Sequence, residues 1–370
     1  MPAAVTMSRA NRRTALLFVL AAIQWTWLLR AVPDVRGNDF GIFYRSASAS
    51  DPYVGHPGDP TVATGDRFTN LNPPHFLLLM KPLTLLPLRL AAVIWWTLSA
   101  WLLAAGLTWW LREQHERWTP EYVAWALLWA PNVTMAFTGQ VTAVLGVVLW
   151  LAYRSLSRGE NLRGGLYAGI VVSCKPILWP LVVWYAARGA WRVLSGVCVG
   201  AAAAVCCGVL VFGVDTYFAW LTALRGITWG SETMNASLAA VGSRLPLLTP
   251  VLLWTGSGVA IALWTIWRMR NHTLNTAWMP LLAVSLLASP LGWVYYGSWL
   301  LPGTRVKTWM SGVALGWCAP MLLVSYLANT SVWSWSIIGS IYGFTLLGIW
   351  LSATSRASAG AAASGPGGIS

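Results

Sequence analysis

The sequence predicts an all-α, polytopic membrane protein with a large first external loop. The chain of 370 residues is 57% hydrophobic and 9% charged, and its mean hydropathy is +0.59, whereas ordinary soluble domains carry about 25% charged residues. Its 27 Trp outnumber the 9 Phe and 11 Tyr together, and indole rings favour the boundary between membrane and water. These observations exclude a soluble enzyme, a disordered chain and a disulfide scaffold.

The basic residues predict how the chain crosses the membrane. The net charge of +13 is spread over short clusters between apolar runs, as the positive-inside rule describes, and forms no single basic face. If every cluster between the spans is cytoplasmic, both termini are cytoplasmic too, and most Lys and Arg lie inside. We therefore expect about 10 to 12 transmembrane helices, with lipids and not nucleic acid as the surroundings.

The first apolar run and the polar segment after it predict a span and an external loop. Residues 14–32 follow three arginines and are long enough to cross a membrane core of about 30 Å. An uncleaved span is favoured, with a cleavable signal peptide as the alternative. Residues 33–74 are rich in Gly, Pro and Asp and form the expected first external loop. The run over 76–111 exceeds one span, so an interfacial helix should precede a span that starts near residue 90.

Later basic clusters divide the rest of the chain into out-and-back pairs. A second external loop is expected over 214–248, a single membrane domain over 1–356, and a disordered cytoplasmic tail over 357–370. Several runs are shorter than about 17 residues, so broken or re-entrant helices are expected. The expected pairs are 122–137 with 141–153, 164–173 with 176–187, 193–212 with 250–267, 277–288 with 294–302, and 309–327 with 332–351.

The polar residues that could carry chemistry fall in segments assigned to the outer face. Asp39 follows the first span within G-N-D-F-G-I-F-Y, where partial desolvation would raise its pKa and suit it to act as a general base; a helix N-cap is the alternative. Lys175 lies within an apolar stretch, so it either neutralises a phosphate or marks a hairpin tip by snorkelling. Arg225 and Arg244 are further candidates for a phosphate.

Metal binding is not expected. Asp51, Asp59, Asp66 and His56 are acidic or imidazole groups in the first loop, but their spacing matches no standard ligand set. The five cysteines form no CxxC pair and are interpreted as buried thiols.

Six short motifs, taken in order, resemble one enzyme family. The chain is similar to the bacterial polyprenol-phosphate-mannose-dependent mannosyltransferases, glycosyltransferase family 87, which have the type C membrane fold. The motifs are Asp39-Phe40 with Tyr44, Asn72-Pro73-Pro74, Gly139-Gln140, Lys175-Pro176, Asn235-Ala236-Ser237-Leu238 with Arg244, and Ser289-Pro290 with Trp293.

The resemblance implies an activity at the outer face of the bacterial plasma membrane. Such enzymes transfer a sugar, with inversion, from a polyprenyl-phosphate donor to a glycolipid or cell-envelope glycan, and no cofactor is implied. The resemblance also implies that Asp39 is the general base and that cations or hydroxyls hold the donor phosphate. The expected phosphate-binding residues are Lys175, Arg244 and Tyr295, and the expected substrate-binding residues are Tyr44, Gln140, Asn235, Ser237, Trp293 and Tyr296.

One departure from the family pattern keeps other functions open. Family members usually have one or two histidines after Ser-Pro and Trp, where this chain has Tyr295 and Tyr296. A phenol donates a hydrogen bond but does not titrate near neutral pH. Mannose is therefore the favoured sugar but not the required one. The alternatives are a polytopic transporter or flippase of lipid-linked sugars, and a catalytically inactive assembly partner.

Overall fold

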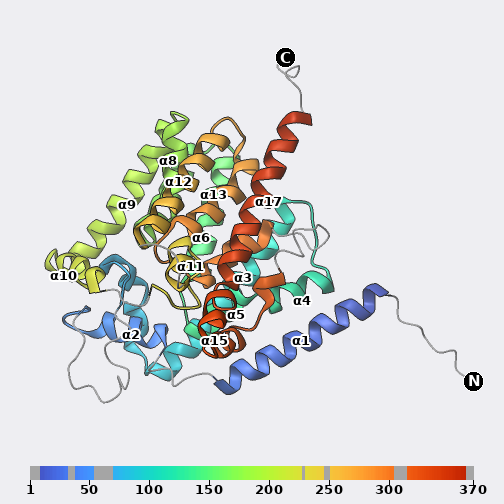
Figure 1. The fold of residues 1–370 in the computed structure, drawn as a ribbon. Helices are drawn as coiled ribbons and strands as arrows, with labels where there is room; N and C mark the ends of the chain where they lie inside the picture. The colour runs from blue at the N-terminus through green and yellow to red at the C-terminus, as the bar shows by residue number, and fades with distance from the viewer. Residues whose placement is uncertain are drawn as a thin grey trace, which may run out of the picture.

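The computed structural model describes residues 9–31, 38–53, 70–226, 230–245, 251–303 and 315–363. Figure 1 shows these parts as a bundle of helices. Across the described ranges the only extended pairing is an isolated bridge between Asn235 and Trp293. Of the first-loop groups considered as metal ligands, His56, Asp59 and Asp66 lie outside the described residues.

Three helical segments are long and apolar enough to cross a membrane. They are α3 (Leu88–Glu113), α9 (Trp191–Phe212) and the stretch Val332–Ala357, within which lie α16 (Val332–Ile337) and most of α17 (Ile341–Ala363). Shorter apolar helices cover Thr142–Ser157, Pro176–Ala187 and Leu274–Ala288. The prediction of an all-α, polytopic membrane protein is confirmed.

The other described helices are mostly short. They are α1 (Arg9–Ala31), α2 (Asp39–Ser48), η2 (Pro74–Leu79), η3 (Lys81–Leu85), α4 (Pro120–Leu128), α5 (Ala130–Thr138), α6 (Thr142–Ser157), α7 (Asn161–Cys174), η4 (Pro176–Leu178), α8 (Trp179–Ala187), α10 (Asp215–Ala223), η5 (Leu224–Gly226), α11 (Leu238–Arg244), α12 (Val251–Met269), α13 (Leu274–Ala288), η6 (Val294–Gly303), η7 (Leu315–Cys318) and α15 (Met321–Ala328).

Several expected spans are interrupted, each with a local cause. The run over 122–137 breaks at Trp129, whose extended backbone separates α4 from α5, and Pro131 opens the second of these helices. The run over 294–302 is the 3₁₀ helix η6, which contains Pro302. α17 continues to Ala363 and so includes residues 357–363 of the segment expected to be disordered. Averaged hydropathy therefore does not locate these helix ends.

Glycines bring α7 and α9 into backbone contact. A Cβ added at Gly165 would lie 2.2 Å from the carbonyl oxygen of Val193, and one at Gly200 would lie 2.2 Å from that of Leu166. Small residues four apart allow this close approach between membrane helices. Because α7 ends at Cys174, the packing fixes the position of Lys175.

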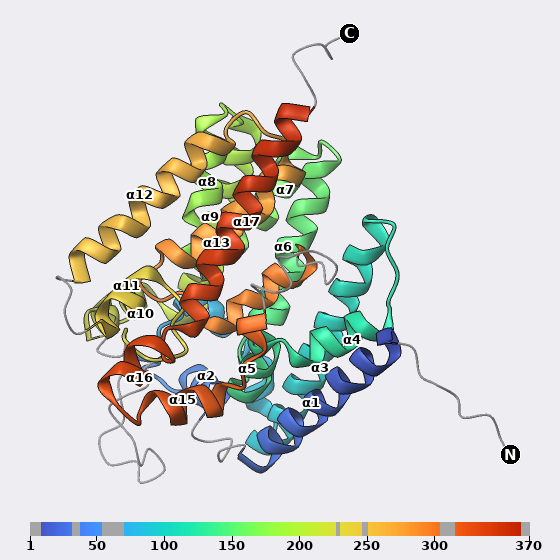
Figure 2. The same ribbon diagram turned by 45° about the vertical axis from the view of Figure 1, so that its right-hand side comes forward.

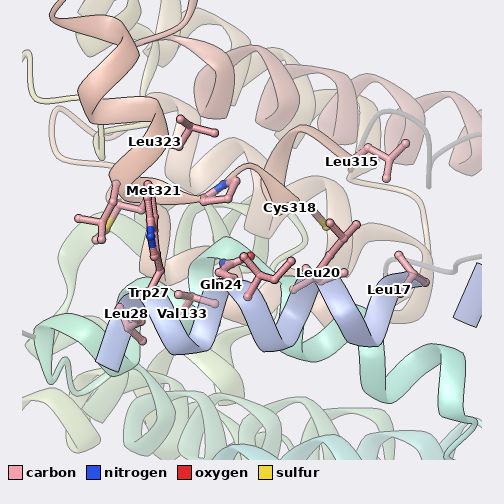
Figure 3. Close-up of a pocket in the computed structure, with 14 residues that line it drawn as sticks. Leu17, Leu20, Gln24, Trp27, Leu28, Val133, Leu315, Cys318, Met321 and Leu323 are labelled. Atoms are coloured by element: carbon pink, nitrogen blue, oxygen red, sulfur yellow. The ribbon is translucent and has the colours of Figure 1, made fainter. Parts of the chain in front are cut away.

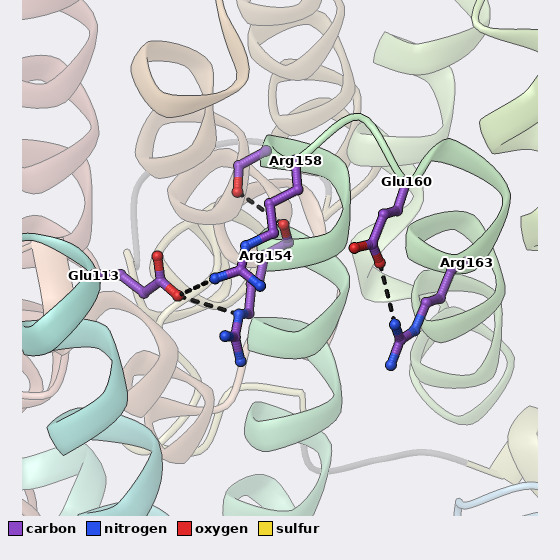
Figure 4. Close-up of polar contacts among 6 residues, drawn as sticks. Glu113, Arg154, Arg158, Glu160 and Arg163 are labelled. Carbon is purple, nitrogen blue, oxygen red and sulfur yellow. Dashed lines mark hydrogen bonds and ion pairs between the residues drawn. The ribbon is translucent and has the colours of Figure 1, made fainter.

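Short helices gather at one end of the bundle, remote from a cluster of ion pairs. Figure 2 shows α2, α10, α11, α15 and α16 gathered at one end of the long helices. At the far end of α6, Glu113 lies 3.1 Å from Arg154 and 3.0 Å from Arg158, and Arg163 pairs with Glu160 (Figure 4). Such exposed pairs contribute only about 0–1 kcal/mol each. α6, roughly 24 Å long, separates these cations from Gln140.

The cysteines differ from expectation in one respect. Cys174 is buried, but Cys198, Cys206 and Cys207 are exposed on α9. α9 is apolar all round, and most of its surface faces away from the bundle. The interpretation of these three as buried thiols was wrong, because an apolar helix in a membrane can turn its apolar side chains to lipid.

Candidate active site

Asp39 is the first residue of α2. Asn38 takes the N-cap position and its side-chain oxygen accepts a hydrogen bond of 3.0 Å from the backbone N–H of Gly41. A side-chain cap satisfies one of the orphan donors of a helix start. Because Asn38 supplies it, the carboxylate of Asp39 is available for other contacts.

The turn after α5 supplies a partner for this carboxylate. Gly139 ends α5 with φ +72°, and a Cβ there would lie 2.6 Å from the Cβ of Phe40. The indole N–H of Trp95 donates to the carbonyl of Gly139 at 2.8 Å. The turn is thereby held against α2, and Gln140 Nε2 donates to the Asp39 carboxylate at 2.5 Å.

Burial changes the acidity of Asp39. Desolvation raises its pKa from 3.8 to about 6, while the hydrogen bond from Gln140 and the positive charge of Lys175 partly oppose this rise. A general base works best when its pKa lies near the operating pH. Asp39 is therefore ionised at neutral pH and still basic enough to accept a proton.

Lys175 lies close enough to Asp39 for its charge to act on the carboxylate. It follows the last residue of α7, and its Nζ donates to the side-chain oxygen of Asn72 at 2.5 Å. The same ammonium sits 5.2 Å from the centre of the Tyr296 ring, within the range of a cation–π contact. Both contacts hold the cation beside the candidate base.

Asn72 is a site residue that sequence reasoning did not single out. It is buried, its backbone and side-chain N–H groups donate to Asn70, and its carbonyl accepts a hydrogen bond of 2.6 Å from the hydroxyl of Tyr53. The Asn72-Pro73-Pro74 motif was the available signal. Its spacing could not indicate that Asn72 contacts Lys175, 103 residues further along.

His75 was also overlooked. It lies on η2, and its Nδ1 is 3.1 Å from the hydroxyl of Tyr217 on α10. Burial lowers its pKa, so the ring is neutral at pH 7. It therefore packs beside the Asn72 segment without adding a charge.

Two tyrosines complete the site. The rings of Tyr295 and Tyr296 meet edge to face at 4.7 Å, and Tyr295 stacks on Trp293 at 6.2 Å. Burial raises the pKa of Tyr295 far above its usual value, and the negative charge of Asp39 contributes to the rise. Tyr295 therefore stays a neutral hydroxyl that can donate a hydrogen bond.

Arg244 is almost fully buried, and the chain itself occupies its donors. Its guanidinium donates to the carbonyls of Ser231, Glu232 and Asn235 at 3.3, 2.7 and 2.8 Å and to the hydroxyl of Ser340 at 3.1 Å. Burial lowers its pKa to about 10. Three of its five N–H groups thus hold the segment 230–245 together, and a fourth joins this segment to Ser340. Binding of a phosphate by Arg244 stays a prediction.

Asn235 and Ser237 tie this segment to the tyrosines. The side-chain amide of Asn235 donates to the carbonyls of Gly230 and Pro290, each at 2.8 Å, and Ser237 caps α11. Backbone hydrogen bonds continue the link, from Ala236 to Gly292 and from Val294 to Met234. The buried segment therefore positions Trp293 and, through it, Tyr295.

Tyr44 has a different neighbour. Its hydroxyl donates to the carbonyl of Leu86 at 2.7 Å, and its ring lies 6.3 Å from that of Phe40. It thus packs α2 against the end of η3. The predicted role in binding substrate stays a prediction.

The structure brings the expected segments to one site. Asp39, Gln140, Lys175 and the two tyrosines are linked by contacts or charge, and Trp293 joins them to the segment 230–245. Within the described ranges no three His, Cys, Asp or Glu side chains gather as a metal site would require. The fold and site thus define an integral membrane protein with a half-buried carboxylate beside a lysine.

The comparison with known proteins identifies the family. Residues 70–291, more than half of the chain, match the family model of glycosyltransferase family 87. The chain belongs to this family and is a glycosyltransferase. No curated protein and no solved structure matches it significantly. Asp39 and the two tyrosines lie outside the matched residues, while Gln140 and Lys175 lie within them.

Proposed function

We propose that the protein transfers a hexose, with mannose favoured, from a polyprenyl-phosphate donor to a glycolipid or cell-envelope glycan. The reaction would take place at the outer face of the bacterial plasma membrane, with both termini in the cytoplasm. One observation carries the proposal: in a member of a glycosyltransferase family, Asp39 has a pKa near 6, a hydrogen bond from Gln140 and a lysine within charge range.

The chemistry is a single displacement. Asp39 takes the proton of an acceptor hydroxyl as its oxygen bonds to the anomeric carbon. The bond from that carbon to the phosphate oxygen breaks, and the polyprenyl phosphate leaves with the electron pair. Attack from the opposite side inverts the anomeric centre. Proton removal by a positioned base contributes typically about 10²–10⁴-fold in rate.

Lys175 and the tyrosines suit the leaving group. Negative charge grows on the departing phosphate, and a fixed cation in a water-poor site stabilises it more than water does. Asn72 and the ring of Tyr296 hold the ammonium in place before the reaction. Tyr295, which stays neutral, can donate a hydrogen bond to the phosphate or the sugar.

The test is sugar transfer by purified full-length protein. Radiolabelled polyprenyl-phosphate mannose is incubated with membrane lipids and either wild type or Asp39→Asn. We expect label in a new glycolipid only with wild type. Asp51→Asn is the matched control, because Asp51 is an exposed carboxylate after the same helix and should leave transfer unchanged.

Each outcome separates the possibilities. Full activity of Asp39→Asn would remove Asp39 from the role of base. Transfer from another lipid-linked sugar, but not from the mannose donor, would correct the sugar and keep the mechanism. Counterflow of lipid-linked sugar across proteoliposomes without covalent product would favour a transporter and overturn the proposal.

A further inference from the structure

An apolar pocket lies between α1 and the elements α5, η7 and α15, distinct from the candidate active site. Its volume is about 430 Å³. Figure 3 shows Gln24 of α1 among the apolar side chains that line it. The wall includes Leu20, Trp27, Val133, Cys318 and Met321.

Gln24 gives this pocket a chemical requirement. The residue is only 5% exposed, and neither its Nε2 nor its Oε1 has a hydrogen-bond partner among the described residues. An unsatisfied buried amide is costly, because it has lost water and gained nothing in exchange. A ligand that fills the pocket should therefore carry a hydrogen-bonding oxygen along with its hydrocarbon.

The dimensions favour one hydrocarbon chain. The pocket lies along α1 from Leu17 to Leu28, a rise of roughly 17 Å, and a volume of 430 Å³ is within the usual range for small ligands. A partner helix, about 10–12 Å across, is too wide for such a space. A long isoprenoid chain carries no hydrogen-bonding atom along its length, so it leaves Gln24 unsatisfied.

We propose that this pocket binds the ester-proximal part of one fatty acyl chain of a membrane glycerolipid. The ester carbonyl accepts a hydrogen bond from Gln24 Nε2, and the chain runs along the roughly 10 Å of α1 between Gln24 and Leu17. α1 is the helix before Asp39, and α5 is the helix before Gln140. Trp25 already fastens α1 to α4 through a hydrogen bond of 2.9 Å to Leu127. The acyl chain would fasten the neighbouring face of α1 to α5 and α15.

The test measures retained lipid. Full-length protein is delipidated in detergent, incubated with dipalmitoyl phosphatidylglycerol or with polyprenyl phosphate, and examined by native mass spectrometry. Wild type should retain one phosphatidylglycerol. Leu20→Trp fills the pocket and should weaken retention at least about tenfold, whereas Leu29→Trp, on the same helix at a position that is 72% exposed and outside the pocket lining, should match wild type.

Gln24→Leu provides a second test, in which the melting temperature is measured with and without lipid. The variant removes an unsatisfied amide, so delipidated Gln24→Leu should melt at a higher temperature than wild type. Phosphatidylglycerol should raise the melting temperature of wild type more than that of Gln24→Leu. The variant lacks one hydrogen bond to the lipid and should therefore bind it about fivefold more weakly. Polyprenyl phosphate can also bind at the proposed active site, so its retention is compared between wild type and Leu20→Trp. Loss of polyprenyl phosphate instead of phosphatidylglycerol in Leu20→Trp, equal retention of phosphatidylglycerol by Leu20→Trp, or equal melting shifts would each overturn the proposal.

Discussion

The pKa of Asp39 makes a prediction that depends on the site geometry. If Asp39 is the base, kcat/KM reports its ionisation in the free enzyme. With a pKa of about 6, kcat/KM should fall with unit slope below pH 6. Between pH 7 and pH 5 the ionised fraction, and hence kcat/KM, should drop about tenfold. A carboxylate with an ordinary pKa of 3.8 would leave kcat/KM almost flat over this range.

Gln140→Leu should move that profile in a known direction. The variant removes the hydrogen bond to the Asp39 carboxylate, and a hydrogen bond to a charged group contributes about 1.5–3 kcal/mol. Since one pKa unit corresponds to about 1.36 kcal/mol, the midpoint should rise by about one to two units, to pH 7 or above. Activity at pH 8.5 should then be better preserved than activity at pH 6.5.

The assay is the initial rate of sugar transfer at low acceptor concentration, from pH 4.5 to 9, in detergent micelles of constant composition. Asp51→Asn serves as the control, because it changes an exposed carboxylate of the same segment and should leave the midpoint unchanged. A flat wild-type profile would refute the assignment of Asp39. If Gln140→Leu lowers the rate equally at every pH, Gln140 has only a structural role.

Four further predictions follow from the same contacts. Asp39→Asn should raise thermal stability at pH 8 but not at pH 4. The pKa of Asp39 is higher in the folded state than in the unfolded state, so ionisation of Asp39 destabilises the fold. This destabilisation begins at about pH 4, is complete above pH 6 and reaches up to about 3 kcal/mol. Lys175→Met should lower kcat/KM about 10²–10³-fold, with Lys175→Arg retaining more activity, as measured by transfer rates. Gly139→Ala should lower the melting temperature by a destabilisation of about 1–3 kcal/mol, since the new Cβ meets Phe40. Arg244→Leu leaves the carbonyls of Ser231 and Asn235 without donors, at about 1–3 kcal/mol each, whereas the carbonyl of Glu232 keeps the backbone N–H of Asn235, so its folded yield should fall in size-exclusion chromatography.

The sequence predicted the fold class, but it could not indicate which residues of the candidate site contact one another. Hydropathy and basic clusters placed most helices near the observed bounds, because those patterns report directly on the lipid surroundings. Trp129 interrupts one expected span, and residues 294–303 form a 3₁₀ helix, since averaged hydropathy does not report local backbone geometry. The hydrogen bond from Gln140 to Asp39 joins positions 101 residues apart and depends on how α2 packs against the turn at Gly139.

Charge alone did not distinguish Lys175 from Arg244. Both were expected to bind a phosphate, and both are cations at segments assigned to the outer face. The structure gives Lys175 one amide oxygen and an aromatic ring as partners, which leaves ammonium N–H donors for a ligand. Arg244 instead uses four donors within the chain. The planar guanidinium with its five donors suits it to gather several carbonyls, and a lysine could not replace it there.

The family match and the site support each other through contacts that cross the boundary of the match. The matched residues begin at position 70, after Asp39, and end at 291, before Tyr295. Yet the two groups that lower the pKa of Asp39, namely Gln140 and Lys175, lie inside the match. The segment 230–245, which positions Trp293, lies inside it as well. If Asp39 were only a helix-start residue, its neighbour Asn38 would suffice as the cap, and partly burying the Asp39 carboxylate against the Gln140 amide would cost stability without return. A carboxylate held in that costly state beside a lysine is typical of a functional site, and this supports the proposed role of Asp39 as the base.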